Sequence, residues 1–118
     1  MARHGSKPTR AISIRQPYVE LILKRKKKIE YRTVPTTIRE TVYLYASLRP
    51  ADDPESWAEA KAAPGDLPVG LIVGTIDIVD CRGEDGDFEY VLARPKRLTR
   101  PLRPTNQPQP VFWRPRFR

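Results

Sequence analysis

The strongest constraint on the fold comes from residues 11–32, which read AISIRQPYVELILKRKKKIEYR. Residues 11–15 alternate between apolar and polar side chains, which is the pattern of a strand with one buried face. Pro17 interrupts this pattern, and its fixed φ angle suits the first position of a helix, with Gln16 as the N-cap. The segment therefore predicts a short strand that turns at once into a helix.

A run of basic residues ends the predicted helix. The helix has an apolar stripe for about two turns, and residues 24–28, KRKKK, then occupy its C-terminal end, where positive charge opposes the negative end of the helix dipole. The next residues alternate again, so that Lys28, Glu30 and Arg32 share one face of a second strand. This arrangement predicts one wall of a cationic cleft, built by charged side chains that project beside the basic run.

Two motifs in this segment are typical of a known family. Residues 13–17 read SIRQP, at the end of the predicted strand and before the helix. Residues 25–32 follow the pattern G-x-K-x-x-E-x-R at Lys27, Glu30 and Arg32. In these motifs the chain resembles the ASCH domain family, which has the PUA-like fold.

The resemblance extends beyond the N-terminal motifs, with one departure inside them. Residues 70–81, GLIVGTIDIVDC, and the basic C-terminal segment also resemble the family, so that nearly all of the chain is covered. Arg25 stands where the family pattern has glycine. This arginine predicts a helix end without the usual left-handed cap, or a different loop.

The rest of the chain predicts further strands separated by proline-rich connections. Strands are expected at residues 41–47, 70–81 and 88–94, with a closing strand at residues 111–113. Asp53 followed by Pro54 predicts a second short helix that runs to about residue 62. We therefore expect an α+β fold, a mostly β barrel of five or six strands with two short helices, and the resemblance implies that this barrel is PUA-like.

Finer features of these strands can also be predicted. Gly74 lies inside the longest strand and predicts a bulge or bend, and alternation places Ile72, Ile76 and Ile78 on one face. Pro95 is expected to break the next strand, because proline cannot donate to the hydrogen-bond ladder. Residues 99–110 contain four prolines and are expected to wrap the barrel as an extended loop.

Length and composition bound the organisation of the chain. A chain of 118 residues predicts one domain, at residues 11–113, with a flexible basic arm at residues 1–10 and a basic tail at residues 114–118. Cys81 is the only cysteine and His4 the only histidine, so we expect no disulfide, no metal site and no cofactor. Since no apolar run has membrane length and no signal peptide is visible, we expect a cytoplasmic monomer that does not bind membranes.

The net charge of +8 is divided into three blocks along the chain. Residues 1–50 carry a net charge of +9, residues 51–93 carry −9, and residues 94–118 carry +8 with no acidic residue. A fold that pairs the first and last blocks would have one strongly positive face that attracts a polyanion. The alternative is that the three blocks form solvated surface and compensate one another.

Nucleic-acid binding is the function that these features favour. Clustered Lys and Arg side chains beside strands, with aromatic residues nearby, are typical of such a surface. The resemblance implies the same, because ASCH and PUA-like domains are regarded as readers of nucleic acids or modified nucleobases, in a cleft between the barrel and the first helix. We expect RNA or single-stranded nucleic acid as the partner. The site residues predicted by the motifs and the basic run are Arg15, Gln16, Lys26, Lys27, Lys28, Glu30, Arg32 and Ser47.

An enzyme is the alternative, since some ASCH-like proteins are described as amidohydrolases of acylated cytidine and others as ribonucleases. Neighbouring cations would disfavour the charged form of Lys27, which could then act as a base with Glu30 as its partner. The amidohydrolases, however, have threonine where Glu30 stands and use a further glutamate that has no identified counterpart here. Two other interpretations stay open: Glu30 only neutralises the lysine cluster, or the chain is a structural part of a nucleoprotein with a protein partner.

Several aromatic residues could either stack on a base or pack against the barrel. Tyr45 precedes Ala46 and Ser47, at a position where ASCH proteins often have histidine. Packing is the favoured interpretation for Tyr45, for Trp57 on the second helix, and for the Phe112–Trp113 pair.

Overall fold

The computed structural model describes residues 7–118, so the first six residues of the predicted basic arm lie outside the described residues. The elements follow one another as β1 (Ala11–Ile14), α1 (Tyr18–Leu23), β2 (Ile29–Arg32), β3 (Thr41–Ala46), α2 (Pro54–Ala60), β4 (Leu71–Glu84), β5 (Asp87–Leu102) and β6 (Phe112–Trp113). Neither helix in this range is long and apolar enough to cross a membrane. Within residues 7–118, no group of three His, Cys, Asp or Glu side chains lies close enough to hold a metal ion.

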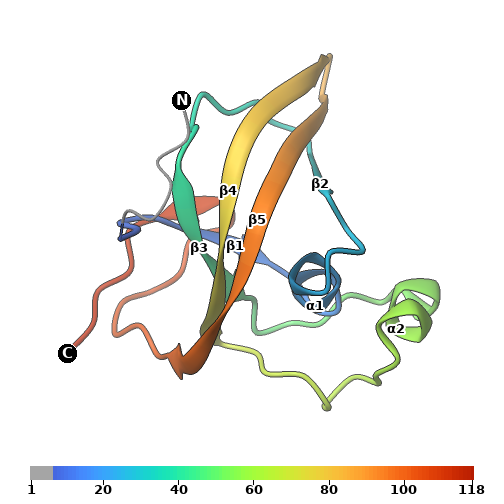
Figure 1. Cartoon of the computed structure of the whole chain (residues 1–118), viewed down its shortest axis with the longest axis vertical. Helices are drawn as coiled ribbons and strands as arrows, with labels where there is room; N and C mark the ends of the chain where they lie inside the picture. The colour runs from blue at the N-terminus through green and yellow to red at the C-terminus, as the bar shows by residue number, and fades with distance from the viewer. Residues whose placement is uncertain (1–6) are drawn as a thin grey trace.

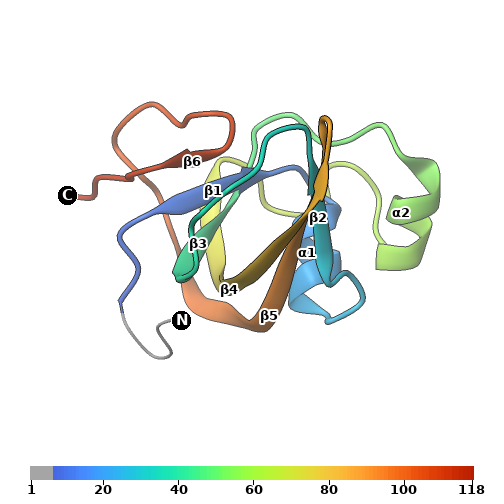
Figure 2. The ribbon, with the colours of Figure 1, turned by 90° about the horizontal axis from the view of Figure 1, so that it is seen from above.

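The six strands form one sheet in the order β2-β5-β4-β3-β1-β6. β4 and β5 make a long antiparallel hairpin, and β3 and β2 pair antiparallel with its two sides. β1 is parallel to β3 and antiparallel to β6. The sheet curls into a half-barrel, which brings β2 toward β1 although they lie near opposite edges of the sheet (Figure 1, Figure 2). The predicted mostly β, α+β fold with two short helices is confirmed.

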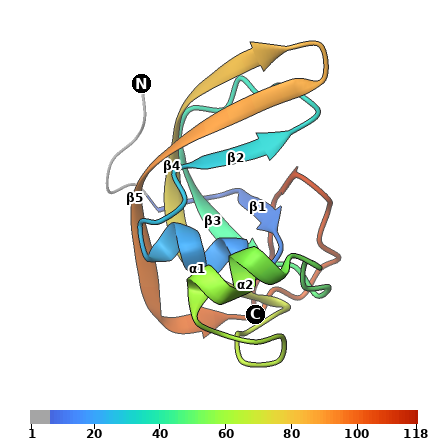
Figure 3. The same cartoon turned by 90° about the vertical axis from the view of Figure 1, so that its right-hand side faces the viewer.

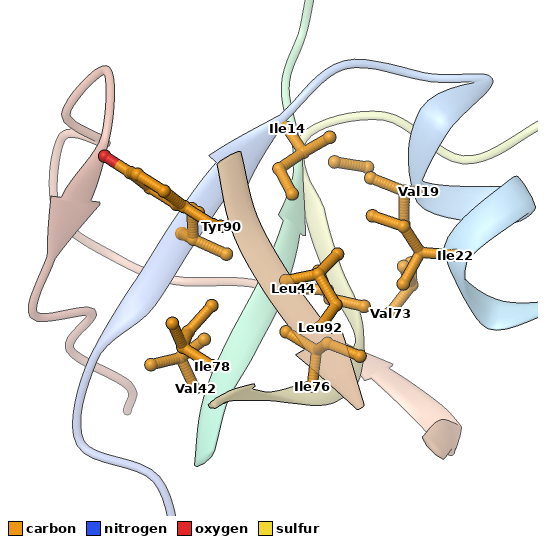
Figure 4. Packing of buried hydrophobic residues seen from close by; sticks show 12 residues of the cluster. Ile14, Val19, Ile22, Val42, Leu44, Val73, Ile76, Ile78, Tyr90 and Leu92 are labelled. Atoms are coloured by element: carbon orange, nitrogen blue, oxygen red, sulfur yellow. The ribbon is translucent and has the colours of Figure 1, made fainter. Parts of the chain in front are cut away.

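The main core lies inside the curl of the sheet and is covered by α1 (Figure 4). Val19 and Ile22 of α1 pack there against aliphatic residues of β3, β4 and β5. A second, smaller cluster lies on the other face of β1 and β3 and consists of Ala11, Tyr43, Tyr45, Ile72 and Trp113. Because both faces of β1 are covered, all four of its residues are buried, including the polar Ser13.

The predicted bulge at Gly74 is confirmed. The register of β4 shifts next to this residue against both β3 and β5. A Cβ atom at Gly74 would lie 2.6 Å from the carbonyl oxygen of Lys96 and 2.7 Å from Cδ2 of Leu23, which is closer than side-chain carbons approach other atoms. Glycine is therefore required here, because α1 and β5 both press against the backbone of β4.

The same bulge changes which residues of β4 face the main core. Ile76 and Ile78 lie in the main core, whereas Ile72, on the other side of the bulge, lies in the second cluster. The prediction that these three residues share one face was wrong, because a bulge adds a residue and interrupts the strict alternation of side chains.

β5 continues through Pro95, so the predicted strand break was wrong. Two residues of β5, Arg94 and Pro95, stand opposite a single residue of β4, and Arg94 has a positive φ angle of 54°. A bulge frees one strand position from the hydrogen-bond ladder, and the missing N–H of Pro95 is tolerated there. β5 includes residues 96–98, which were expected to continue as an edge strand, and it extends to Leu102 through residues 99–102, which the sequence predicted as loop.

The start of α1 differs by one residue from the prediction. The helix begins at Tyr18 with Pro17 as its N-cap, and the peptide bond between Gln16 and Pro17 is cis. The prediction of Gln16 as the N-cap and Pro17 as the first helical residue was therefore wrong. The Gln16 side chain still supports the helix, because its Oε1 accepts a hydrogen bond from the N–H of Glu20 (3.1 Å), which has no acceptor within the helix.

The end of α1 is a Schellman motif centred on Arg25. The N–H of Lys26 donates to the carbonyl of Leu21 (2.9 Å), and the N–H of Arg25 donates to the carbonyl of Ile22 (3.0 Å). Arg25 has a φ angle of 63°, the left-handed conformation in which this motif normally has glycine. The expectation that this arginine excludes a left-handed cap was therefore wrong, since the cap forms with an arginine in it.

Replacing Arg25 by glycine should stabilise the fold. A residue with a side chain pays about 1–2 kcal/mol in the left-handed conformation, and glycine removes this cost. Part of the gain is lost, because glycine also makes the unfolded chain more flexible. We expect Arg25→Gly to raise the free energy of unfolding by about 0.5–1 kcal/mol in urea denaturation. Lys61, at the end of α2, has a φ angle of 56°, and Lys61→Gly should give a similar gain. Lower urea midpoints in both variants would contradict this explanation.

Candidate functional site

A pocket of about 510 Å³, which we call the main pocket, opens between the two sides of the half-barrel. Its walls come from β1, the start of α1, β2, the end of β3 and residues 108–110. The lining residues are Ser13, Arg15, Tyr18, Glu30, Arg32, Tyr45, Ser47, Leu48, Arg49, Pro108, Gln109 and Pro110. Half of the residues that the sequence predicted for the site lie here, namely Arg15, Glu30, Arg32 and Ser47.

Arg32 joins the two sides of the half-barrel across this pocket. Its Nε donates to Glu30 Oε2 (2.9 Å) on the same strand, and its Nη2 donates to the carbonyl of Ser13 in β1 (2.6 Å). Its Nη1 donates to the carbonyl of Pro110 (3.3 Å), in the segment that leads to β6. Because β2 and β1 are not neighbours in the sheet, this one guanidinium supplies polar contacts where the sheet has no backbone ladder.

Residues 103–111, which we call the strap, contribute residues 108–110 to the wall of the main pocket. Ser13 holds the strap from β1, because its N–H donates to the carbonyl of Val111 (2.9 Å) and its hydroxyl donates to the carbonyl of Gln109 (2.6 Å). The indole N–H of Trp113 donates to the same hydroxyl oxygen (3.0 Å). The sequence predicted an extended loop in this part of the chain but did not place it at the site, because proline-rich segments have no periodicity that reveals their position.

Lys27 lies behind Glu30 and does not line the main pocket. Its Nζ is 3.6 Å from Glu30 Oε1. It also lies over two aromatic rings, 5.3 Å from the ring centre of Tyr18 and 5.1 Å from that of Tyr31. The carboxylate and both rings attract the Lys27 ammonium group, so three neighbours fix the position of this side chain.

β2 turns its charged face inward. Glu30 is only 7% exposed, whereas Tyr31 on the opposite face is 65% exposed, the reverse of the usual order in a sheet. Lys28 precedes β2, is exposed and does not line the main pocket, although alternation grouped it with Glu30 and Arg32. The predicted charged face therefore exists for Glu30 and Arg32, and it serves as the wall of the pocket.

Gln16 and Lys26 lie away from the main pocket. Gln16 is 1% exposed, and its Nε2 donates to the carbonyl of Pro68 (3.1 Å), so it joins α1 to the loop before β4. Lys26 Nζ donates to the carbonyl of Glu59 in α2 (3.3 Å). These contacts give Gln16 a structural role and place Lys26 on the α2 side of the molecule, where α1 and α2 lie side by side (Figure 3).

Two arginines of the main pocket are exposed and available to a ligand. Neither Arg15 nor Arg49 forms an ion pair or a side-chain hydrogen bond within residues 7–118. Arg15 was predicted from the sequence, whereas Arg49 was not, although it follows the predicted Ser47 by two residues. Tyr45 also lines the pocket, and its ring packs edge-to-face against Trp113 with 5.2 Å between the ring centres, which favours the packing interpretation. Burial raises the pKa of Tyr45.

Tyr18 connects the pocket to α2. Its hydroxyl donates to Asp53 Oδ2 (2.7 Å), and Asp53 Oδ1 accepts from the N–H of Ser56, which confirms Asp53 as the N-cap of α2. The hydrogen bond to Asp53, with a smaller effect of burial, raises the pKa of Tyr18 to about 12. The same hydrogen bond, together with those from Ser56, lowers the pKa of Asp53. α2 is thereby anchored to the wall of the pocket.

The chain belongs to the ASCH domain family, because the family model of the ASCH domain matches residues 12–99. This is a PUA-like family, as the N-terminal motifs indicated. The matched residues include both helices, β2, β3 and β4, whereas the strap lies beyond them. No curated protein matches the sequence.

Arg32→Lys should loosen the half-barrel. A lysine keeps the charge but cannot donate to three oxygens in different directions, so we expect a loss of about 1.5–3 kcal/mol in the free energy of unfolding. The strap should also be cut faster by a protease. Arg82→Lys is the matched control, because Arg82 pairs with Glu89 on the exposed surface at 3.4 Å, and its effect should stay below about 0.5 kcal/mol. Equal effects of the two substitutions would contradict the role of Arg32.

The Tyr18–Asp53 hydrogen bond should make stability depend on pH in the alkaline range. The pKa of Tyr18 is raised from 10.0 to about 12 on folding, so its contribution to stability is complete below pH 10 and is lost as the pH rises through 12. Tyr18→Phe should therefore be less stable than the parent at neutral pH, and the difference should disappear above pH 12. The exposed Tyr31→Phe is the control. A difference that persists above pH 12 would show that the hydroxyl of Tyr18 acts in another way.

Proposed function

We propose that the chain binds single-stranded RNA and holds one nucleobase, standard or modified, in the main pocket. The proposal rests on the wall of this pocket, a space of about 510 Å³ lined by the ion pair of Glu30 and Arg32 and by Ser47. Ligand pockets in proteins commonly have volumes of about 300–1,000 Å³. A base has polar edges and flat apolar faces. The wall of the pocket has polar groups that suit the edges and aromatic rings that suit the faces.

Glu30 is the group that would read the edge of the base. Its Oε2 accepts a hydrogen bond from Arg32, whereas its Oε1 has only the longer contact of 3.6 Å with Lys27. A carboxylate accepts hydrogen bonds and cannot donate them, so Oε1 favours an exocyclic amino group such as N4 of cytosine. The pocket should therefore prefer bases that carry an amino group over uracil.

Arg15 and Arg49 would hold the phosphates next to this base. Both are exposed at the pocket, and their side chains make no polar contact within residues 7–118 that a phosphate would have to displace. The lining residues all come from the first and last charge blocks of the sequence, and Glu30 is the one acid among them. This distribution supports a polyanionic ligand, because the acidic block contributes nothing to the wall.

The hydrolase alternative depends on Lys27 and Glu30, which the sequence predicted as catalytic residues. Lys27 lies outside the main pocket, where its Nζ contacts Glu30 and two aromatic rings, so it does not line the space that a ligand in that pocket would occupy. Glu30 borders the pocket, but its carboxylate is already engaged by Arg32 and Lys27. These contacts favour binding over catalysis.

Binding of labelled single-stranded RNA at several salt concentrations tests the proposal. Affinity should fall as salt rises, and Arg15→Gln and Arg49→Gln should each weaken binding about three- to tenfold and reduce the salt slope by about 0.7. Arg82→Gln, on the distant hairpin, removes the same charge and serves as the control. A salt-independent affinity, or losses no larger than that of Arg82→Gln, would contradict the proposal.

Glu30→Gln extends this experiment to base selectivity. Glutamine offers an amide that can also donate, so the variant should lose the preference for cytosine over uracil while it still binds RNA. Hydrolysis of an acylated cytidine by the parent chain, abolished in Glu30→Gln, would instead make the chain an enzyme.

A further inference from the structure

We propose that the α1–β2 loop and the β5 bulge form a second, phosphate-binding subsite, so that the ligand is an RNA strand of several nucleotides rather than a free base or nucleoside. This inference rests on the proposed function of the main pocket and extends it to the length of the ligand. The observation that supports it is a second cationic pocket, which we call the bulge pocket.

The bulge pocket has a volume of about 280 Å³ and lies where the end of α1 faces β5. Arg25, Lys28 and Arg94 line it, together with the apolar side chains of Ile76 and Leu92, and no acidic residue does. Within residues 7–118, Arg25 and Lys28 have no ion-pair partner, whereas Arg94 uses its Nε for Asp77 Oδ2 (2.7 Å). Cations beside an apolar floor, without carboxylates in the lining, suit an anion such as a phosphodiester.

Two of these cationic residues have a positive φ angle, a conformation that glycine adopts at a lower free-energy cost. Arg25 has a φ angle of 63° at the end of α1, and Arg94 has a φ angle of 54° in the bulge of β5. These residues come from separate parts of the chain, yet both line the same pocket. The fold thus tolerates two residues with a side chain in the left-handed backbone conformation beside one pocket. Glycine at either position would remove one cation from this pocket.

A third pocket connects this subsite to the main pocket. It also has a volume of about 280 Å³, lies between α1 and α2, and is lined by three lysines, Lys26, Lys27 and Lys28, by one acid, Glu59, and by Tyr18 among others. Tyr18 belongs to this pocket and to the main pocket, while Lys27 and Lys28 belong to this pocket and to the bulge pocket. The three pockets therefore adjoin one another along α1 and the basic loop that follows it.

This arrangement determines which ligand uses the whole site. A single nucleotide held in the main pocket leaves the bulge pocket empty, whereas a strand that continues past Tyr18 brings its next phosphates to the basic loop. RNA is the occupant favoured over an anionic lipid surface, because the pockets are concave and the main pocket has groups suited to a base.

The test compares two ligands and two matched variants of the full chain. The ligands are a nucleoside monophosphate and a single-stranded RNA of about ten nucleotides, a length typical of single-strand sites. Arg25→Gly and Lys61→Gly each remove one exposed cation from a left-handed helix end, and both should fold. Lys61 lines none of the three pockets and therefore controls for the loss of charge.

We expect Arg25→Gly to weaken binding of the RNA about three- to tenfold and to reduce its salt slope by about 0.7, while binding of the monophosphate stays unchanged. Lys61→Gly should change neither. Equal RNA affinities of Arg25→Gly and Lys61→Gly would overturn the subsite. Vesicles of anionic lipid serve as a third ligand, and the subsite would also be overturned if Arg25→Gly lost binding to the vesicles but not to RNA. If Arg15→Gln leaves both ligands unaffected, the proposed function of the main pocket itself has failed.

Discussion

The structure of this half-barrel depends on the three hydrogen bonds that the Arg32 guanidinium donates across its open side. β2 lies at one edge of the sheet and β1 lies near the other, so no backbone ladder connects them. Arg32 spans this opening with one hydrogen bond to Glu30, one to β1 and one to the strap. The geometry of the main pocket follows from these three bonds, because each of them fixes a different wall.

Glu30 makes this role of Arg32 possible. A guanidinium largely removed from water needs a carboxylate nearby, and the buried carboxylate of Glu30 needs cations around it. Lys27 is the second cation, and it is oriented by the rings of Tyr18 and Tyr31. The charged face of β2 is therefore stable inside the fold and at the same time presents polar groups to a ligand. Under the proposed function, the residues that stabilise this part of the fold also recognise the ligand.

Much of the fold could be predicted from periodicity, and its irregular positions could not. Alternation located the strands and the shared face of Glu30 and Arg32, and Gly74 marked a bulge. The continuation of β5 through Pro95 was missed, because a bulge that tolerates proline depends on the partner strand. The left-handed cap at Arg25 was missed because the fold overrides the local preference for glycine there.

The site was predicted in part for a similar reason. Sequence motifs identified the residues of β1 and β2, yet they grouped Gln16 with the ligand-facing residues, whereas its amide is buried between α1 and the loop before β4. Arg49 and the strap come from segments without periodic pattern, and only the three-dimensional arrangement places them at the pocket. Motifs reveal which residues are grouped along the chain, but burial decides which of them face a ligand.

We propose that the main pocket, rather than another surface of the half-barrel, holds a nucleobase. An NMR titration of the full chain with a short cytidine-containing RNA tests this proposal most directly. We expect saturable shifts of the backbone amides of Ser47, Arg49 and Gln109, with little change at the hairpin tip around Gly86. Shifts confined to the pocket at that tip, lined by Tyr31, Gly86 and Phe88, would contradict it.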